Sequence, residues 1–305
     1  MRKKLLGKQA WTLGVGAGFA GLAVVALKFF VRSATKLRVP DSISPAVFST
    51  KVVNTALGET VYHEAGSGQP LIFVHDICCG GSSYEWSKVC PAFVRDHRVI
   101  ALDLVGFGES ARPARRFTAA DYVGQLADFV RAVTRGDATG PAVFVASGLG
   151  AGFCAALAVA HPELVGGMVF YRPNGGGEFG LQPISAMTKV IYRQALLGRF
   201  LYRNHLSTRK TIVQWLREEA FSQPEKVSDV DLQVFATCAQ QPGAEHAVLS
   251  WLGGRLAFDF GEAALKLRNR VQVLESGALL AALETPEKMA SAVADGLDAL
   301  RRMTG

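Results

Sequence analysis

Cysteine is scarce in this chain, and its few copies are poorly placed for pairing. The five cysteines are Cys78, Cys79, Cys90, Cys154 and Cys238, and the first two are adjacent in the sequence. No CxxC pair and no Cys/His spacing typical of a zinc site occurs. The sequence therefore argues against a disulfide framework and a structural metal site, and we expect buried, reduced thiols and no cofactor.

Acidic residues are absent from the first forty positions, which hold eight lysines and arginines. The other 265 residues carry 25 basic and 26 acidic side chains, so they nearly cancel. The formal net charge of +7 therefore comes from the N-terminus. A basic face for nucleic acid is not predicted in the rest of the chain.

A long apolar run, Ala10–Val31, is interrupted only by Lys28. It can cross about 30 Å of hydrocarbon as a helix, so residues 1–40 are predicted as a transmembrane anchor and linker, with cleavage left open. Gly14 and Gly18 have the spacing of a helix–helix contact, although small residues are also common in membrane helices. An acid-free basic start followed by an anchor fits an organelle inner membrane (mitochondrial or plastid) and a bacterial plasma membrane equally. Basic residues flank both ends of the run, so its orientation stays open.

The body of the chain alternates short apolar runs with segments of helical spacing. The apolar runs are Leu71–His75, Val99–Leu104, Val143–Val145, Met168–Tyr171 and Val271–Leu274. Such runs predict an α/β domain, residues 41–305, with a mostly parallel sheet and helices on both of its faces. Residues from about 175 to 255 interrupt the alternation and are predicted to form an inserted helical cap.

Four motifs follow one another along the chain: LIFVHDICCGGSSYEW, RVIALDLVGFGESARP, ADYVGQLADFVRAV and VFVASGLGAGFCAALAVAHPELVGGMVF. In order and spacing they resemble the α/β-hydrolase fold family, especially its cap-bearing branch of esterases, epoxide hydrolases and haloperoxidase-like proteins. Residues Asp103 to Ser110 match that branch's D-x-x-G-F-G-x-S turn. The resemblance implies this fold from about residue 47 to at least residue 262, with a shortened C-terminal strand–helix unit.

The resemblance also locates the position of the family's nucleophile. In the family it lies at the centre of G-x-S-x-G, in a sharp strand-to-helix turn. Residues 146–150 fit this turn best, because the helix that follows then reaches His161-Pro162 with the family's length. Gly148, which has no atom with which to attack, thus takes the nucleophile position, and Ser147 is interpreted as an ordinary turn serine.

The base and the oxyanion hole are altered as well. One alignment puts Leu279 in the histidine slot, whereas another places Val271–Leu274 before the family's acid, and no Asp follows until Asp295. The family's His-Gly after the third strand is His75-Asp76 here, which puts a carboxylate where negative charge would develop. His75 itself is more readily explained as a turn histidine bonded to the backbone.

These departures favour a protein that is not an enzyme: a non-catalytic α/β-hydrolase-like structural or accessory subunit of a membrane protein complex. Two alternatives stay open. One is a membrane-anchored hydrolase that uses an off-pattern nucleophile such as Cys154, Cys78 or Ser82. The other is a module that binds a lipid or another apolar ligand in its cleft.

Overall fold

The computed structural model describes residues 37–40, 46–135, 140–173, 185–257, 267, 270–274 and 277–304. The described residues from Arg38 onward belong to one compact unit. The apolar run Ala10–Val31, with Gly14 and Gly18, lies outside the described residues. Within those residues, no helix combines the length and the apolar character needed to cross a membrane.

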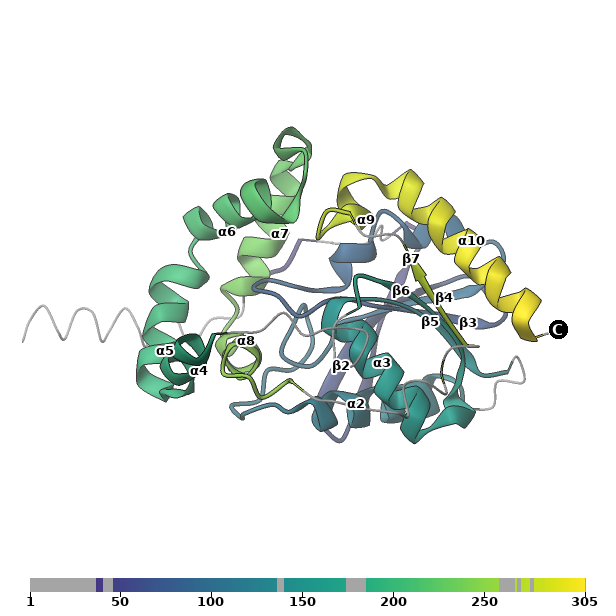
Figure 1. Ribbon diagram of the computed structural model, residues 1–305, viewed down its shortest axis with the longest axis horizontal. Helices are drawn as coiled ribbons and strands as arrows, with labels where there is room; N and C mark the ends of the chain where they lie inside the picture. Colours follow the sequence, from purple (N-terminus) through teal and green to yellow (C-terminus); the bar gives the residue numbers. More distant parts are fainter. Residues whose placement is uncertain are drawn as a thin grey trace, which may run out of the picture. The chain divides into compact units, whose positions relative to one another are not determined.

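A seven-stranded sheet forms the centre of this unit, with the strand order β1-β2-β4-β3-β5-β6-β7 (Figure 1). The first two strands pair antiparallel, as do β2 and β4, and every other neighbouring pair is parallel. The strands are β1 (Ser49–Thr55), β2 (Gly58–Ala65), β3 (Pro70–Val74), β4 (Arg98–Leu102), β5 (Ala142–Ser147), β6 (Val165–Tyr171) and β7 (Val271–Leu274).

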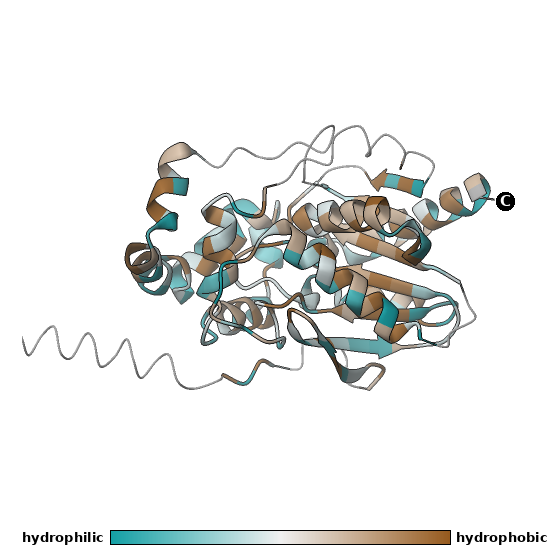
Figure 2. Cartoon of the chain, turned by 90° about the horizontal axis from the view of Figure 1, so that it is seen from below, coloured by the Kyte–Doolittle hydropathy of each residue, from teal (hydrophilic) through white to brown (hydrophobic). Residues whose placement is uncertain are grey.

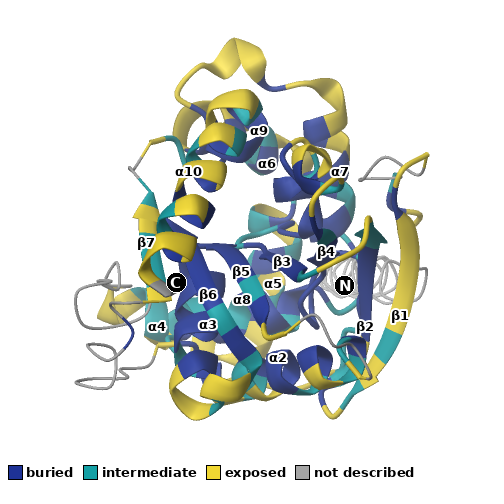
Figure 3. Cartoon of the chain, turned by 90° about the vertical axis from the view of Figure 1, so that its right-hand side faces the viewer, coloured by how far each residue is buried: buried dark blue, intermediate teal, exposed yellow. Residues whose placement is uncertain are grey.

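Helices cover both faces of the sheet, and the alternation of side chains along each strand supplies a core to each face. On β3, Ile72 and Val74 join the core under α2 (Ala119–Val133) and α3 (Gly148–Ala160), whereas Leu71 and Phe73 join the core under α10 (Pro286–Thr304). Figure 3 shows the central strands buried between these layers, while β1 is largely exposed. Strands β3 to β6 therefore read as continuous apolar runs.

Three short 3₁₀ helices and one short α-helix complete the core. They are η1 (Ser83–Trp86), η2 (Cys90–Phe93), η3 (Pro162–Leu164) and α9 (Ala281–Glu284). The first of these follows β3, so its side chains reach the edge of the sheet at which the parallel strands end. Trp86 fixes it there, because its indole Nε1 donates to the carbonyl of Val74 at 3.1 Å.

Between β6 and β7 the chain folds into a group of helices, which Figure 1 shows in green beyond the strand ends. They are α4 (Ala186–Arg193), α5 (Ala195–Leu201), η5 (Tyr202–Leu206), α6 (Arg209–Trp215), η6 (Leu216–Ala220), η7 (Pro224–Lys226), α7 (Asp229–Ala239) and α8 (Glu245–Leu252). The helix α7 begins with a capping box, in which Ser228 and Asp231 bond each other's backbone N–H.

The predicted α/β architecture is confirmed: each of the five predicted apolar runs coincides with a strand of the sheet. The antiparallel strands β1 and β2 were not predicted. Strand β1 lies at the edge of the sheet, and most of its side chains are exposed. It therefore lacks the apolar run by which the buried strands were found.

Candidate functional site

The turn between β5 and α3 places Gly148 at the apex of a sharp change in chain direction. Ser147 has extended backbone angles, and Gly148 then takes a φ of 49° before the helix continues. A Cβ atom at Gly148 would lie 1.9 Å from Cγ of Asp76. Glycine is required here both by the backbone conformation and by the carboxyl group that fills the space above it.

Asp76, which follows β3 and His75, directs its carboxyl group into this space. Its Oδ1 accepts hydrogen bonds from the backbone N–H of Leu149 at 2.8 Å and of Ile77 at 2.7 Å. Oδ2 has no hydrogen-bond partner among the described residues, and the side chain is partly exposed. Two converging N–H groups beside a strand-to-helix turn are the donors of an oxyanion hole, and here they hold a carboxylate oxygen.

The pKa of Asp76 is set by opposing influences. Burial raises it, while the two N–H donors and the positive charge of Arg172 lower it, and the net direction is upward. Arg172 directly follows β6 and has a φ of 47°, an unusual conformation for a residue with a side chain. Its guanidinium donates to the carbonyl of Gly277 at 2.8 Å, which holds the side chain in place.

A second carboxyl group, that of Glu85 in η1, lies behind Asp76. Glu85 is buried; its Oε2 accepts from the backbone N–H of Asp76 at 2.9 Å, and its Oε1 accepts from the hydroxyl of Ser147 at 2.5 Å. Burial, and then the charge of Asp76, raise the pKa of Glu85 to about 8. At neutral pH Glu85 is therefore mainly protonated, and its Oε1 accepts the hydrogen bond from Ser147.

His75 is held by the backbone at both ring nitrogens. Its Nδ1 lies 2.7 Å from the carbonyl oxygen of Asp76, and its Nε2 accepts from the N–H of Leu104 at 3.1 Å. Burial lowers the pKa of this histidine, which keeps it neutral. The ring fixes the end of β3 and leaves no nitrogen for proton transfer.

The C-terminal segment, from which the family's histidine and acid were expected, places no base at the site. Leu279 is half-buried and packs against the core formed by α6, α7 and η1. Asp295 lies exposed on α10. Among the described residues, the carboxyl group of Asp76 has hydrogen bonds only with backbone N–H groups, so no described histidine is bonded to it.

The off-pattern nucleophiles considered from the sequence are not activated. Cys154 is buried within α3, and burial raises the pKa of its thiol. Burial also raises the pKa of Cys78, and the carboxylates of Asp76 and Glu85 raise it further. Ser82 caps η1, where its hydroxyl accepts from the N–H of Tyr84 at 3.4 Å. These thiols would remain protonated, and a thiol is a much poorer nucleophile than a thiolate.

No group of three or more His, Cys, Asp or Glu side chains among the described residues has an arrangement that could hold a metal ion. The pair Asp76 and Glu85 is instead satisfied by backbone N–H groups and by Ser147.

The model of the family described as alpha/beta hydrolase fold matches residues 69–195, which include the turn at Gly148. The chain belongs to the α/β-hydrolase fold family. A 2-hydroxy-6-oxo-6-(2'-aminophenyl)hexa-2,4-dienoic acid hydrolase of Metapseudomonas resinovorans is 29% identical over 61% of this chain and 72% of its own length. A 2-hydroxymuconate semialdehyde hydrolase of Pseudomonas sp. (strain CF600) is 33% identical over 38% of this chain and 40% of its own.

Among solved structures, the haloalkane dehalogenase DatA of Agrobacterium tumefaciens C58 superposes with a TM-score of 0.65. It is 19% identical, and the match covers 84% of this chain and 97% of that chain. At this identity the likeness shows that the two proteins share the α/β-hydrolase fold.

The prediction that this protein is not an enzyme is wrong, because the α/β-hydrolase relatives that it matches are hydrolases. The prediction rested on the missing side chain at Gly148, the missing base and acid, and the altered oxyanion hole. The structure shows that the space above Gly148 is filled by another side chain, the carboxyl group of Asp76, which follows the neighbouring strand β3.

Two residues of the site were not identified from the sequence. Glu85 was not singled out, although a glutamate in the otherwise apolar and small stretch SSYEW is unusual, and a buried carboxyl group needs partners. Nothing in the sequence pointed to Arg172, because its position depends on a backbone conformation that only the structure shows.

Proposed function

We propose that this α/β-hydrolase is an enzyme whose reacting group is the carboxylate of Asp76. The observation that supports the proposal is the position of this group above Gly148, with Oδ1 held by Leu149 and Ile77 and with Oδ2 free to react. Carboxylates are established nucleophiles in covalent catalysis. The group is oriented by backbone donors before any substrate binds, so little reorganisation is needed.

The proposed reaction is hydrolysis in two steps at a saturated carbon. Oδ2 attacks the carbon and forms an ester with Asp76, while the bond to the leaving group breaks and the leaving group takes the electron pair. Water then attacks Cγ of this ester, and the bond between Cγ and Oδ2 breaks. The departing oxygen takes one proton of the water, and solvent takes the other. The product alcohol retains Oδ2, and the carboxylate is regenerated with the oxygen of water.

The same two N–H groups serve both steps. In the first step they keep Oδ1 in place, which directs Oδ2 outward. In the second step the tetrahedral intermediate places its negative charge on Oδ1, which Leu149 and Ile77 already contact. A serine-type acyl transfer fits less well, because the oxyanion of the substrate would need the position that Asp76 fills.

Alkyl halides and epoxides are the substrate class that this chemistry favours, since both have an electrophilic saturated carbon with a leaving group. The dehalogenase that shares the fold supports testing haloalkanes first. The dienoic acid hydrolase, as a relative, makes 2-hydroxy-6-oxo-dienoic acids the second group for assay.

Isotope labelling tests the proposal directly. In a single turnover in H₂¹⁸O, the product alcohol should contain ¹⁶O, and the peptide that carries Asp76 should gain one ¹⁸O by mass spectrometry. The variant Asp76→Asn should lose turnover and labelling, whereas Asp96→Asn, at an exposed aspartate, should keep both. Label in the product with none in Asp76, or no turnover of any of these substrates, would overturn the proposal.

The predicted N-terminal anchor adds a location to this proposal. The run Ala10–Val31 is proposed to hold the enzyme at a membrane, with Gly14 and Gly18 in contact with a helix of another subunit of a membrane complex. Retention in the membrane pellet through salt and carbonate washes tests the anchor. A native gel that compares wild type with Gly14→Leu/Gly18→Leu tests the contact, and wild type migrating as a monomer would contradict it.

A further inference from the structure

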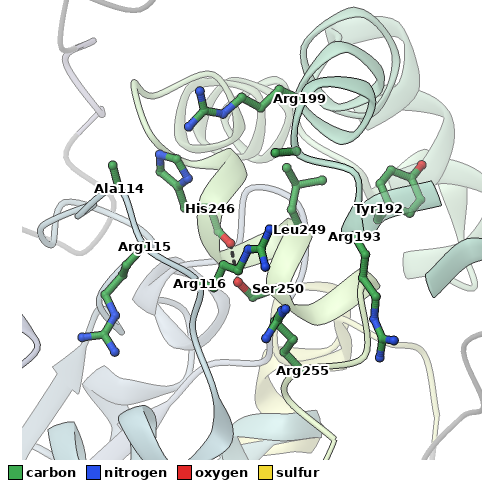
Figure 4. Close-up of a pocket in the computed structure, with 11 residues that line it drawn as sticks. Ala114, Arg115, Arg116, Tyr192, Arg193, Arg199, His246, Leu249, Ser250 and Arg255 are labelled. Carbon is green, nitrogen blue, oxygen red and sulfur yellow. Dashed lines mark hydrogen bonds between the residues drawn. The ribbon is translucent and has the colours of Figure 1, made fainter. Parts of the chain in front are cut away.

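A cavity of about 290 Å³ lies between the cap helices and the loop before α2. Figure 4 shows arginine side chains around it that come from separate parts of the chain. Its charged and polar lining residues are Arg115, Arg116, Arg193, Arg199, Arg255, His246, Tyr192 and Ser250. None of the residues that line it is acidic. We call this cavity the arginine pocket.

Several of these arginines have partners beside the pocket. Arg115 pairs with Asp121 at 2.6 Å, and Arg199 lies 3.9 Å from Glu245. Glu245 also pairs with a further arginine, Arg203, at 2.7 Å. Its single negative charge therefore does not balance the two positive charges of Arg199 and Arg203. The pocket therefore retains an excess of positive charge.

Two arginines, Arg116 and Arg255, have guanidinium groups with no hydrogen bond or ion pair to any described residue. Both side chains are exposed, and Figure 4 shows both at the same pocket. Gathering like charges is unfavourable for a folded chain unless an anion binds among them. Guanidinium groups match the oxygens of a phosphate in geometry as well as in charge.

The helices that form one wall of the pocket also expose large apolar side chains. Helix α4 exposes Met187 (69%) and Val190 (57%), and α5 exposes Leu196 (85%), Leu197 (45%) and Phe200 (53%). Figure 2 shows hydrophobic colouring on the left-hand helices, the side on which Figure 1 labels α4 and α5. Exposed apolar side chains that gather on two helices mark an interaction surface.

We infer that α4, α5 and the arginine pocket form a docking surface for an anionic phospholipid bilayer. The phosphate of a lipid headgroup occupies the pocket against Arg116 and Arg255, and the apolar side chains of α4 and α5 enter the acyl boundary. Apolar insertion beside cationic groups is the chemistry of proteins that lie on membrane interfaces. This inference goes beyond the proposed reaction and does not depend on it.

Binding of short-chain lipids to the full-length protein in neutral detergent tests this surface. We expect dihexanoyl-phosphatidylglycerol to bind at least ten-fold more tightly than dihexanoyl-phosphatidylcholine in calorimetric titrations. Arg116→Gln/Arg255→Gln should remove this preference. Leu196→Ser/Phe200→Ser should weaken binding of both lipids. The charge-matched control Arg95→Gln/Arg302→Gln, at exposed sites outside the pocket, should change neither.

Inorganic phosphate separates the two possible sources of the anion. It should bind more weakly than the glycerol lipid, and its binding should be lost in Arg116→Gln/Arg255→Gln and kept in Leu196→Ser/Phe200→Ser. If phosphate binds as tightly as the lipid, the pocket serves a free phosphate compound and the bilayer proposal is overturned. Equal affinity for the two lipids, or binding of neither, overturns it as well.

Discussion

The site at Asp76 and the arginine pocket differ in whether their charged side chains have partners. At the site, two carboxyl groups lie at the end of the sheet, and their oxygens accept from backbone N–H groups and a hydroxyl. In the pocket, five arginines face a cavity, and Arg116 and Arg255 have no partner among the described residues. The first arrangement is complete before anything binds, whereas the second lacks its counter-charge. Changes at the site should therefore alter both chemistry and stability, and changes in the pocket should alter binding alone.

The largest effect is expected from Gly148→Ala. The new methyl group would overlap the carboxyl group of Asp76 and would force a side chain into a φ of 49°. We expect activity to fall by at least about 10³-fold and stability to fall by about 2–4 kcal/mol. Substrate turnover and urea unfolding measure the two effects.

Gly124→Ala is the matched control for this change. Gly124 lies in α2, and a Cβ there would meet no atom within 4 Å. Alanine should therefore leave activity intact and should stabilise the protein by about 0.5–1 kcal/mol through helix propensity. If Gly148→Ala and Gly124→Ala have the same activity and stability, the position of the Asp76 carboxyl group does not require a glycine at 148.

The next effect concerns pH and Glu85→Gln. Because folding raises the pKa of Glu85 to about 8, its stabilising contribution is complete at acid pH and is lost as pH rises toward 8. Glutamine preserves the shape without titrating, so this variant should lack that decline. By pH 8 the free energy of unfolding of the variant should exceed that of wild type by a few kcal/mol, as measured by urea unfolding. If the two proteins have the same pH profile, folding does not raise the pKa of Glu85.

A smaller effect is expected from Arg172→Gln on the pH dependence of turnover. The positive charge of Arg172 lowers the pKa of Asp76, so its removal should raise that pKa. The acid limb of the profile of kcat/KM should then move to higher pH, because Asp76 must be ionised to attack. Arg302→Gln, on α10, should leave the limb in place. An unchanged acid limb in Arg172→Gln would show that the charge of Arg172 does not influence the pKa of the reacting group.

The smallest effect belongs to the arginine pocket. Arg116 and Arg255 stabilise no described partner, so Arg116→Gln/Arg255→Gln should change the free energy of unfolding by no more than about 0.5 kcal/mol. A loss above about 1 kcal/mol would show that these arginines support the fold, and the contrast with the Asp76 site would fail. Urea unfolding at low and high salt makes the measurement.

Sequence alone determined the fold and the position of the turn. Buried strands such as β3 and β5 need continuous apolar runs, because helices cover both faces of the sheet, and such runs can be read locally. Gly148 could be placed at the nucleophile position because the length of α3 fixes the register. The missing attacking side chain at that position, the missing base and acid, and the altered oxyanion hole were then taken, wrongly, to mean that the protein is not an enzyme.

Only the tertiary structure decided what fills that position. Asp76 meets Leu149 across 73 positions of sequence, and Glu85 meets Ser147 across 62. These contacts exist because β3 and β5 are neighbours in the sheet, and sequence spacing carries no information about where the loop after β3 directs a side chain. The arginine pocket likewise combines the loop before α2 with cap helices more than seventy residues away. Local pattern thus determines the elements, whereas the chemistry arises from side chains that the packing of those elements brings together.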